Sequence, residues 1–278
     1  MPKAGRWHRV MPTARLKMYR SIANRSLQNV LAYRNSYVIN LMAGTINLLA
    51  IYFLWKGIYS GRIEVGGYTW DQMKTYLLVT FLANSVLSWY SETAISGKIL
   101  DGSVAVDLLK PIDFQSARFA ETLGSSLFEG AQSLILITVF ALCITGIAFP
   151  DSALVYVLFI FSLLGAVLVK FGIVYLAALV CFWSTGSMGI VWTRIALTNL
   201  LSGALVPLAF FPDWLERLAL VLPFQSIIHT PTMIFLEQAG TWESLGLIGL
   251  QWFWGILLWL AGKAMWSWAV RQVTIHGG

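Results

Sequence analysis

Charged residues are scarce in this sequence, and their scarcity excludes an ordinary water-soluble domain. Asp, Glu, Lys and Arg make up 12% of the 278 residues, whereas about a quarter is usual in soluble domains. Hydrophobic residues make up 58%, and the 13 tryptophans and 10 tyrosines suit the two membrane interfaces. We therefore predict an all-α polytopic membrane protein, because helices satisfy their own backbone hydrogen bonds in lipid.

Motifs of metal, nucleotide and thiol chemistry are also missing. The three histidines lie far apart and lack the paired spacing of a zinc protease helix. Gly97 and Lys98 lack the upstream glycine and the following Ser or Thr of a phosphate-binding loop. Cys143 and Cys181 fall in predicted spans, where we expect packing rather than a disulfide. We expect no enzyme activity, and no catalytic residue, cofactor or metal in this chain.

The first 37 residues contain no acidic residue. They carry eight basic ones: Lys3, Arg6, Arg9, Arg15, Lys17, Arg20, Arg25 and Arg34. Leu16, Tyr19, Ala23, Leu27 and Val30 recur at helical spacing. We interpret residues 1–37 as a cytoplasmic segment whose amphipathic helix lies on anionic lipids at the inner membrane surface, and a helix packed on a soluble partner is the alternative. Because these charges gather at one end of the chain, we expect no nucleic acid partner.

Long uncharged runs predict six transmembrane helices, since a helix needs about 20 apolar residues to cross the bilayer. The expected spans are residues 38–56, 75–95, 126–149, 153–182, 190–210 and 244–263, in a single domain of residues 38–268. Six spans after a basic amino-terminal segment place both termini, including the tail 269–278, in the cytoplasm. If Lys170 began a separate seventh helix, the tail would lie outside.

Lys170 places a charge inside the predicted fourth span. Burial of a charge in hydrocarbon costs at least about 2.5–3.5 kcal/mol unless the side chain finds water or a partner. We expect the side chain to extend to the inner membrane surface. A site for ion coupling is the alternative.

The inner loop, residues 97–113, contains a short segment between Gly102 and Pro111. Three apolar residues of this segment can form one patch: Val104, Leu108 and Leu109. Two charged residues, Asp107 and Lys110, lie beside them. A helix this short is stable only when it docks on other structure. We predict a coupling helix that inserts into a separate motor subunit, and an ordinary interfacial linker is the alternative.

The stretch before the last span, residues 212–237, is apolar but cannot cross the bilayer. It is marked by prolines and a short charged run, and the residues we single out are Pro207, Pro212, Asp213, Trp214, Pro223 and Pro231. We predict one short helix from Pro212 that ends before Pro223, and a second piece that turns back at Pro231. Each piece is half a bilayer long, which predicts a re-entrant helical hairpin at the outer face.

These motifs resemble the membrane subunit of type-2 ABC exporters. The resemblance rests on SGALVPLAFFPDWL from Ser202, on LPF from Leu222, on Pro231 and on DLLKPID from Asp107, all placed as in six-span permeases. The subgroup with a separately encoded ATPase is the most similar. The resemblance implies a bacterial inner membrane protein that pairs with a second permease, identical or paralogous, above two ATPase subunits that bind ATP and Mg²⁺.

The resemblance also implies a pathway between the first, second and fifth spans of the two permeases. Six residues are candidates to line it: Asn40, Asn47, Trp55, Trp192, Asn199 and Ser202. We therefore predict the permease subunit of an ABC exporter, which moves substrate when ATP hydrolysis in the partner tilts the docked loop. An ion-coupled secondary transporter or channel that uses Lys170 or Glu129 is the alternative, and a membrane protein without transport activity is a third hypothesis.

Overall fold

The computed structural model describes residues 12–32, 34–85, 89–110, 112–144, 146–184 and 187–272. Helices dominate these ranges, and the strands β1 (Glu64–Val65) and β2 (Tyr68–Thr69) form one small antiparallel hairpin within them. The longer helices are α1 (Pro12–Ala32), α2 (Arg34–Ile58), α3 (Trp70–Ser85), α4 (Trp89–Leu100), α6 (Phe114–Cys143), α7 (Ala153–Leu179), α8 (Ser187–Leu201) and α11 (Thr241–Ala269). The short helices are α5 (Val104–Leu108), α9 (Asp213–Val221) and α10 (His229–Phe235). Single turns of 3₁₀ helix are η2 (Val180–Phe182), η3 (Leu208–Phe210), η4 (Pro223–Ser226) and η5 (Val270–Gln272).

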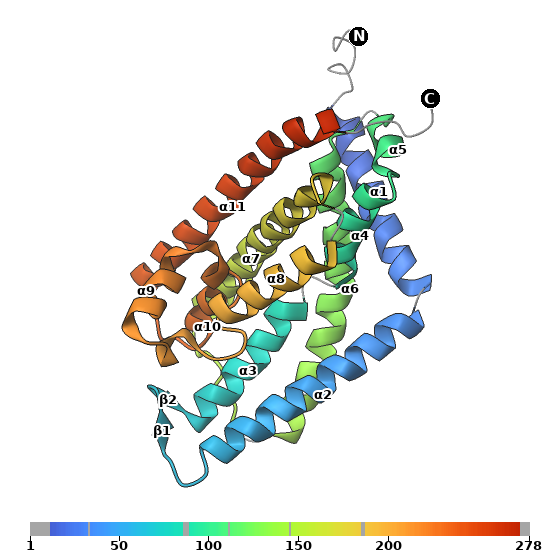
Figure 1. The fold of residues 1–278 in the computed structure, drawn as a ribbon. Helices are drawn as coiled ribbons and strands as arrows, with labels where there is room; N and C mark the ends of the chain where they lie inside the picture. The colour runs from blue at the N-terminus through green and yellow to red at the C-terminus, as the bar shows by residue number, and fades with distance from the viewer. Residues whose placement is uncertain are drawn as a thin grey trace.

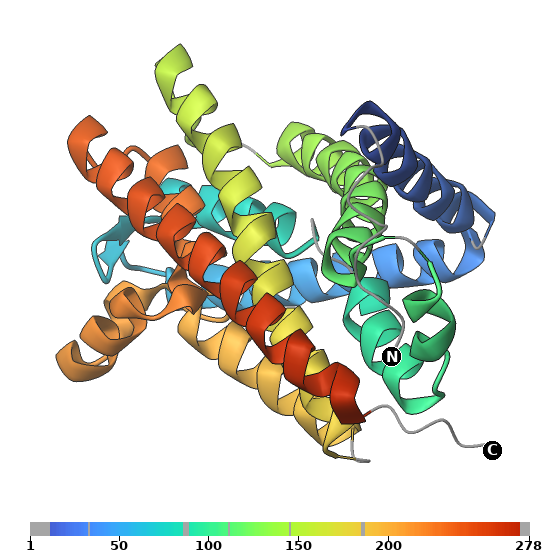
Figure 2. The ribbon, with the colours of Figure 1, turned by 90° about the horizontal axis from the view of Figure 1, so that it is seen from above.

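The helices form an elongated bundle with two different ends. Helices α1 and α5 and the carboxyl end of α11 lie at one end, and β1, β2 and α9 lie toward the other (Figure 1). Helices α7 and α11 run side by side through the molecule in both ribbon views (Figure 2). The inner loop, residues 97–113, and the predicted helical hairpin, residues 212–237, therefore lie far apart, with the long helices between them. We call residues 212–237 the hairpin.

Four helices among the described residues are long and apolar enough to cross a membrane: Leu41–Ile58, Phe114–Cys143, Ala153–Phe182 and Thr241–Ala269. They overlap the predicted first, third, fourth and sixth spans, although α6 ends at Cys143 and not at residue 149. The prediction of an all-α membrane protein is confirmed. The predicted second span holds two helices, α3 and α4, and residues 86–88 between them lie outside the described residues. The predicted fifth span, 190–210, is α-helical only to Leu201 and has a 3₁₀ turn at Leu208–Phe210. With 16 residues, α3 is about 24 Å long, which is less than the hydrocarbon thickness.

Helices α3 and α6 begin well before their predicted spans because polar side chains cap them. Thr69 and Gln72 exchange hydrogen bonds, with Thr69 N donating to Gln72 Oε1 at 3.0 Å and Gln72 N donating to Thr69 Oγ1 at 3.3 Å. This reciprocal pair is a capping box, and it starts α3 at Trp70. The Asp113 carboxylate accepts from the backbone N–H of Ser116 at 2.9 Å and starts α6. Counting uncharged runs misses both starts because the first turns are polar.

Four glycines bring α7 and α11 together. A Cβ on Gly172 of α7 would lie 2.6 Å from Leu258 Cβ, and a Cβ on Gly255 of α11 would lie 2.8 Å from Leu168 Cδ2. Gly165 and Gly262 receive side chains in the same way, one on each helix. Each helix thus presents glycines seven residues apart to large side chains of the other. Small residues of this kind let membrane helices approach closely, where dispersion contacts hold them together.

Helix α1 packs along the first half of α6. A Cβ on Gly124 of α6 would overlap the Ala23 carbonyl of α1, and Ser26 of α1 is also buried. The cationic side chains of Lys17, Arg20 and Arg25 remain exposed. The apolar side of α1 is therefore partly covered by α6, rather than by lipid alone as the sequence predicts.

The glycine contact between α7 and α11 predicts a large difference between two alanine variants. Gly172→Ala forces a methyl group into Leu258, and we expect a loss of about 1–3 kcal/mol of stability from overpacking. Gly246→Ala on α11 is the matched control, because a Cβ there meets nothing within 4 Å. Thermal unfolding of the purified chain in detergent measures both. Equal melting temperatures for the two variants would contradict the packing described here.

Candidate functional site

The inner loop is held together by one buried carboxylate, Asp107. Lys98 Nζ of α4 donates to Asp107 Oδ2 at 3.0 Å, and Lys110 Nζ donates to Oδ1 at 2.6 Å. Arg118 of α6 adds a third cation, with its guanidinium 3.5 Å from Oδ2. We call this set, Lys98, Asp107, Lys110 and Arg118, the Asp107 clamp. It ties α5 to the helix that precedes the loop and to the helix that follows it.

The clamp keeps Asp107 ionised. Burial on its own raises the pKa of a carboxyl, but here the hydrogen bonds from Lys110 and Lys98 and the charge of Arg118 outweigh it and lower the pKa of Asp107. Arg118 also pairs with Glu121 one turn further along α6, at 2.6 Å. Asp107 and Lys110 are predicted from the sequence, but the roles of Lys98 in α4 and Arg118 in α6 are not, because they arise only from tertiary contacts.

Backbone geometry turns the chain into α5. Gly102 has a φ of +75°, a left-handed conformation that favours glycine. The Asp101 carboxylate accepts from the backbone N–H of Ser103 at 2.8 Å and closes the turn. Gly102 and Asp101 set the direction in which α5 leaves the turn, and the Asp107 clamp holds α5 in place.

The apolar residues of the loop divide into two groups. Val104, only 2% exposed, packs inward with Ile95, Ile99 and Phe114, so it does not form one exposed patch with Leu108 and Leu109 as predicted. Leu109 is 83% exposed, and Val106 and Leu108 are exposed beside it. The outward patch therefore consists of Val106, Leu108 and Leu109, and the sequence analysis misses Val106. Pro111 lies outside the described residues.

The hairpin residues lie at the opposite end of the bundle. Pro212 precedes the first residue of α9, and Asp213 and Trp214 are exposed on that helix. Pro207 and Pro223 are buried in the turns on either side of α9. Pro231 lies in the first turn of α10, so the prediction that the chain turns back there is wrong. An N–H in the first turn has no intrahelical partner, which is why proline fits.

Helix α10 is enclosed by α3, α7 and α11. The Gln251 amide of α11 donates to the Ser226 carbonyl at 2.6 Å, and Thr230 Oγ1 donates to Gln225 Oε1 at 2.7 Å. All four residues are fully buried. The hairpin thus inserts its second half into the bundle through hydrogen bonds that satisfy polar groups away from water.

The residues predicted to line the pathway differ in how far their side chains are exposed. Asn47 of α2 and Trp192 of α8 are exposed, and Asn199 is half-buried. Trp55 is buried with its ring centroid 5.4 Å from that of Phe210, and Ser202 is fully buried. These two residues contribute to packing inside the chain. The side chain of Asn40 lies outside the described residues.

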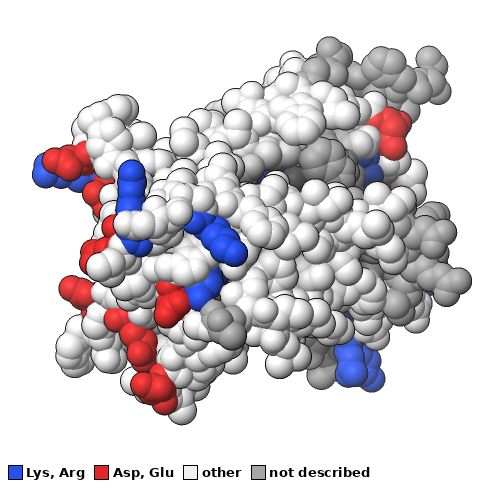
Figure 3. Space-filling model, turned by 90° about the horizontal axis from the view of Figure 1, so that it is seen from below, with Lys and Arg blue, Asp and Glu red and all other residues white. Residues whose placement is uncertain are grey.

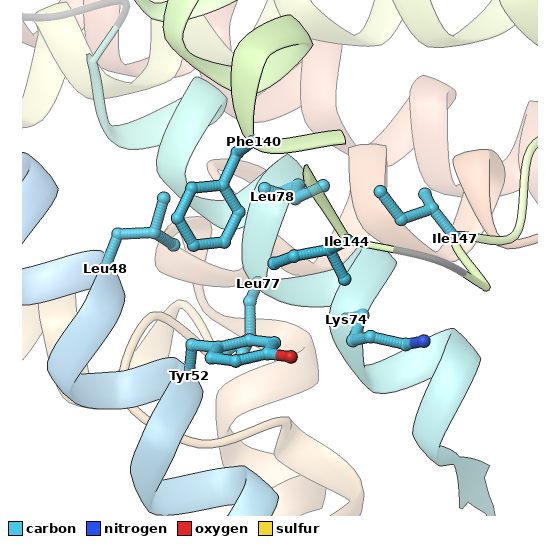
Figure 4. Close-up of a pocket in the computed structure, with 8 residues that line it drawn as sticks. All are labelled: Leu48, Tyr52, Lys74, Leu77, Leu78, Phe140, Ile144 and Ile147. Atoms are coloured by element: carbon cyan, nitrogen blue, oxygen red, sulfur yellow. The ribbon is translucent and has the colours of Figure 1, made fainter. Parts of the chain in front are cut away.

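A small cavity lies between α2, α3 and the end of α6 (Figure 4). Its volume is about 10 Å³, which is room for roughly one water molecule. Its walls are Leu48, Tyr52, Leu77, Leu78, Phe140, Ile144 and Ile147, with Lys74 at one side. Lys74 pairs with Asp71 at 2.8 Å. A cavity this small does not hold a transported substrate.

The remaining charges have distinct environments. Acidic side chains gather along the left edge of the face in Figure 3, the side on which β1, β2 and α9 lie in Figure 1.

Lys170 of α7 donates to the Asn84 carbonyl at 2.9 Å. Glu129 of α6 is buried, and so is Arg194 of α8, which the sequence analysis does not single out. Within the described residues, no cluster of His, Cys, Asp and Glu has the arrangement of a metal site.

A comparison with known families identifies the chain. The family of ABC-2 family transporter proteins matches residues 45–277, more than four-fifths of the chain. Among curated proteins no match is found. The matched residues include the Asp107 clamp, the outward patch and the hairpin. This chain therefore belongs to the ABC-2 transporter family and is a membrane component of an ABC transporter.

Proposed function

We propose that this chain is the permease subunit of an ABC exporter and forms the pathway through which substrate leaves the cell. A separately encoded ATPase binds ATP and Mg²⁺ and drives the movement, and this chain supplies no catalytic residue. The chain crosses a bacterial inner membrane six times, with α3 and α4 together as the second crossing and α8 with η3 as the fifth. Both termini then lie in the cytoplasm.

The outward patch is the observation that carries this proposal. Leu109 and its neighbours expose apolar surface at the end of the bundle where α1 lies, on a loop that the Asp107 clamp holds in place. A fixed apolar projection of this kind suits a groove on another protein, where a few buried side chains supply most of the binding energy. In a chain of this family, the partner that fits is the ATPase.

The clamp also supports a mechanical role for the loop. Lys98 belongs to α4 and Arg118 to α6, and both hold Asp107. A displacement of α5 by the ATPase is therefore passed to two membrane helices at once. Both contacts reach a buried carboxylate, at 3.0 Å from Lys98 and 3.5 Å from Arg118, so the loop moves with those helices rather than independently.

Exposed polar residues in the membrane helices support the proposal that this chain pairs with a second permease. Asn47 lies within a span helix, α2, yet its side chain is exposed at the surface of the single chain. An amide in contact with lipid lacks hydrogen-bond partners, which favours contact with another subunit or with a hydrated pathway. We propose that α2 and α8 of two permeases face each other, with Asn47, Trp192 and Asn199 beside the substrate.

The two ends of the chain meet different parts of the membrane in this arrangement. Lys17, Arg20 and Arg25 of α1 lie at the inner surface, where anionic lipids attract basic residues by about 1 kcal/mol per charge. The hairpin lies at the outer surface, and α9 exposes Trp214 there as an interfacial side chain. The hairpin caps the exit side of the pathway.

A charge in the outward patch is expected to disrupt the partnership. Leu109→Asp places an unpaired carboxylate where an apolar groove closes, and we expect ATPase binding to weaken by more than about tenfold. Ile63→Asp is the matched control, because Ile63 is also a highly exposed apolar residue but lies beside β1 at the opposite end. Copurification of a chain with a phosphate-binding loop, together with ATP hydrolysis, measures the effect. Unchanged copurification with Leu109→Asp would contradict the proposed docking surface.

Removing the charge of Asp107 is expected to weaken coupling without unfolding the membrane helices. Asp107→Asn loses charge-assisted hydrogen bonds from Lys98 and Lys110, which are worth about 1.5–3 kcal/mol. We expect faster trypsin cleavage after Lys98, because the bond between Lys110 and Pro111 resists trypsin, and about tenfold weaker ATPase binding. Asp151→Asn, an exposed carboxylate between α6 and α7, is the control. If trypsin cleaves Asp107→Asn no faster than the control, the clamp does not hold the loop.

A further inference from the structure

Lys170 lies deep within α7, about 25 Å from the start of that helix at Ala153. Its side chain is only 6% exposed, and Nζ donates to the backbone carbonyl of Asn84 at 2.9 Å. The structure thus differs from the expectation that this side chain extends to the membrane surface. The contact supplies a polar partner that compensates for the cost of burying the ammonium group.

Asn84 lies at the carboxyl end of α3, which ends at Ser85. The carboxyl end of a helix carries a partial negative charge, and a lysine near it can hydrogen-bond its carbonyls. The contact therefore gives the buried ammonium group a polar partner in the last described turn of α3.

The residues around Lys170 join three parts of the chain. Val169 and Ile173 of α7 are buried in one cluster with Ala83 of α3, with Ile227 and Ile228 of the hairpin, and with Ala204 in the chain that leads to it. The inner end of α3 and the hairpin therefore pack on the same surface of α7. A shift of α3 against α7 disturbs the packing that supports the hairpin.

Two turns earlier, α3 contacts the chain that leads to the hairpin directly. The Tyr76 hydroxyl donates to the Gly203 carbonyl at 2.6 Å, and both Tyr76 and Ser202 are buried. Gly203 has a φ of +87°, and a Cβ there would lie 2.7 Å from the Tyr76 hydroxyl. The next carbonyl back, Ser202, accepts from His229 N at 3.1 Å and so holds the start of α10.

We propose that Lys170 is a positioning residue for the hairpin: it fixes the inner end of α3 and thereby keeps Tyr76 against Gly203 and α10 inside the bundle. The role is structural and distinct from ion coupling. Its consequence for transport rests on the proposed function, since a displaced hairpin disturbs the exit side of the pathway. The positioning itself is measurable on the chain alone.

Cysteine labelling tests this role. Cys143 and Cys181 are replaced by serine, and either Thr232→Cys in α10 or Ser162→Cys in α7 supplies a single thiol, since both positions are fully buried. In lipid vesicles, we expect Lys170→Met to raise the labelling rate of Thr232→Cys at least tenfold and to leave Ser162→Cys unchanged. Lys170→Arg keeps a cation at the carbonyl and restores slow labelling. Lys263→Met, an exposed lysine on α11, is the control.

Two results would overturn the proposal. One is slow labelling of Thr232→Cys in Lys170→Met, which means that α10 does not depend on the lysine. The other is an equal rise at Ser162→Cys, which means general unfolding rather than a displaced hairpin. ATPase binding is measured in parallel, and we expect Lys170→Met to retain it. Absent binding in the unsubstituted chain would count against the proposed function and leave the labelling result intact.

Discussion

The close approach of α7 and α11 is the contact on which the other parts of the structure depend. Glycines on both helices remove the side chains that would keep the backbones apart, and Leu168 and Leu258 fill the spaces. The hydrophobic effect does not drive helices together within lipid, so this packing has to come from shape. Helix α10 packs against both members of the pair, and α4 packs against α7. The pair is therefore the frame against which the inner loop and the hairpin are positioned.

Two charged side chains, Asp107 and Lys170, fix the positions of neighbouring helices relative to one another. In the inner loop, Asp107 joins α4, α5 and α6, and within the bundle Lys170 joins α7 to the last described turn of α3. Both groups are buried, and a buried charge without a partner is expensive. Each contact is consequently hard to break, and the elements that it joins keep their relative positions. The proposed transport cycle then moves groups of helices rather than single side chains.

The sequence predicts the class of the protein and most of its long helices, because both follow from composition and hydrophobic length. Four long apolar helices and the short α5 and α9 occur where the sequence places them. It fails where polar residues belong to helices, as at the capped starts of α3 and α6. It also fails to separate Val104, which is buried, from Leu109, which is exposed, because five residues are too few for periodicity to orient a helix. The partners of Asp107 depend on tertiary contacts that a linear pattern does not contain.

The contact between Gly124 and Ala23 has a consequence for the energetics of movement. Since the two backbones touch, α1 cannot slide or rotate freely against α6, and it follows that helix as a rigid attachment. Lys17, Arg20 and Arg25 are then displaced whenever α6 is displaced. In the proposed arrangement α1 lies at the inner membrane surface, so each such displacement would change the distance between these cations and the lipid phosphates. The attraction between these cations and the lipid phosphates therefore contributes to the resting position of α6. This attraction increases with the surface charge density of the bilayer.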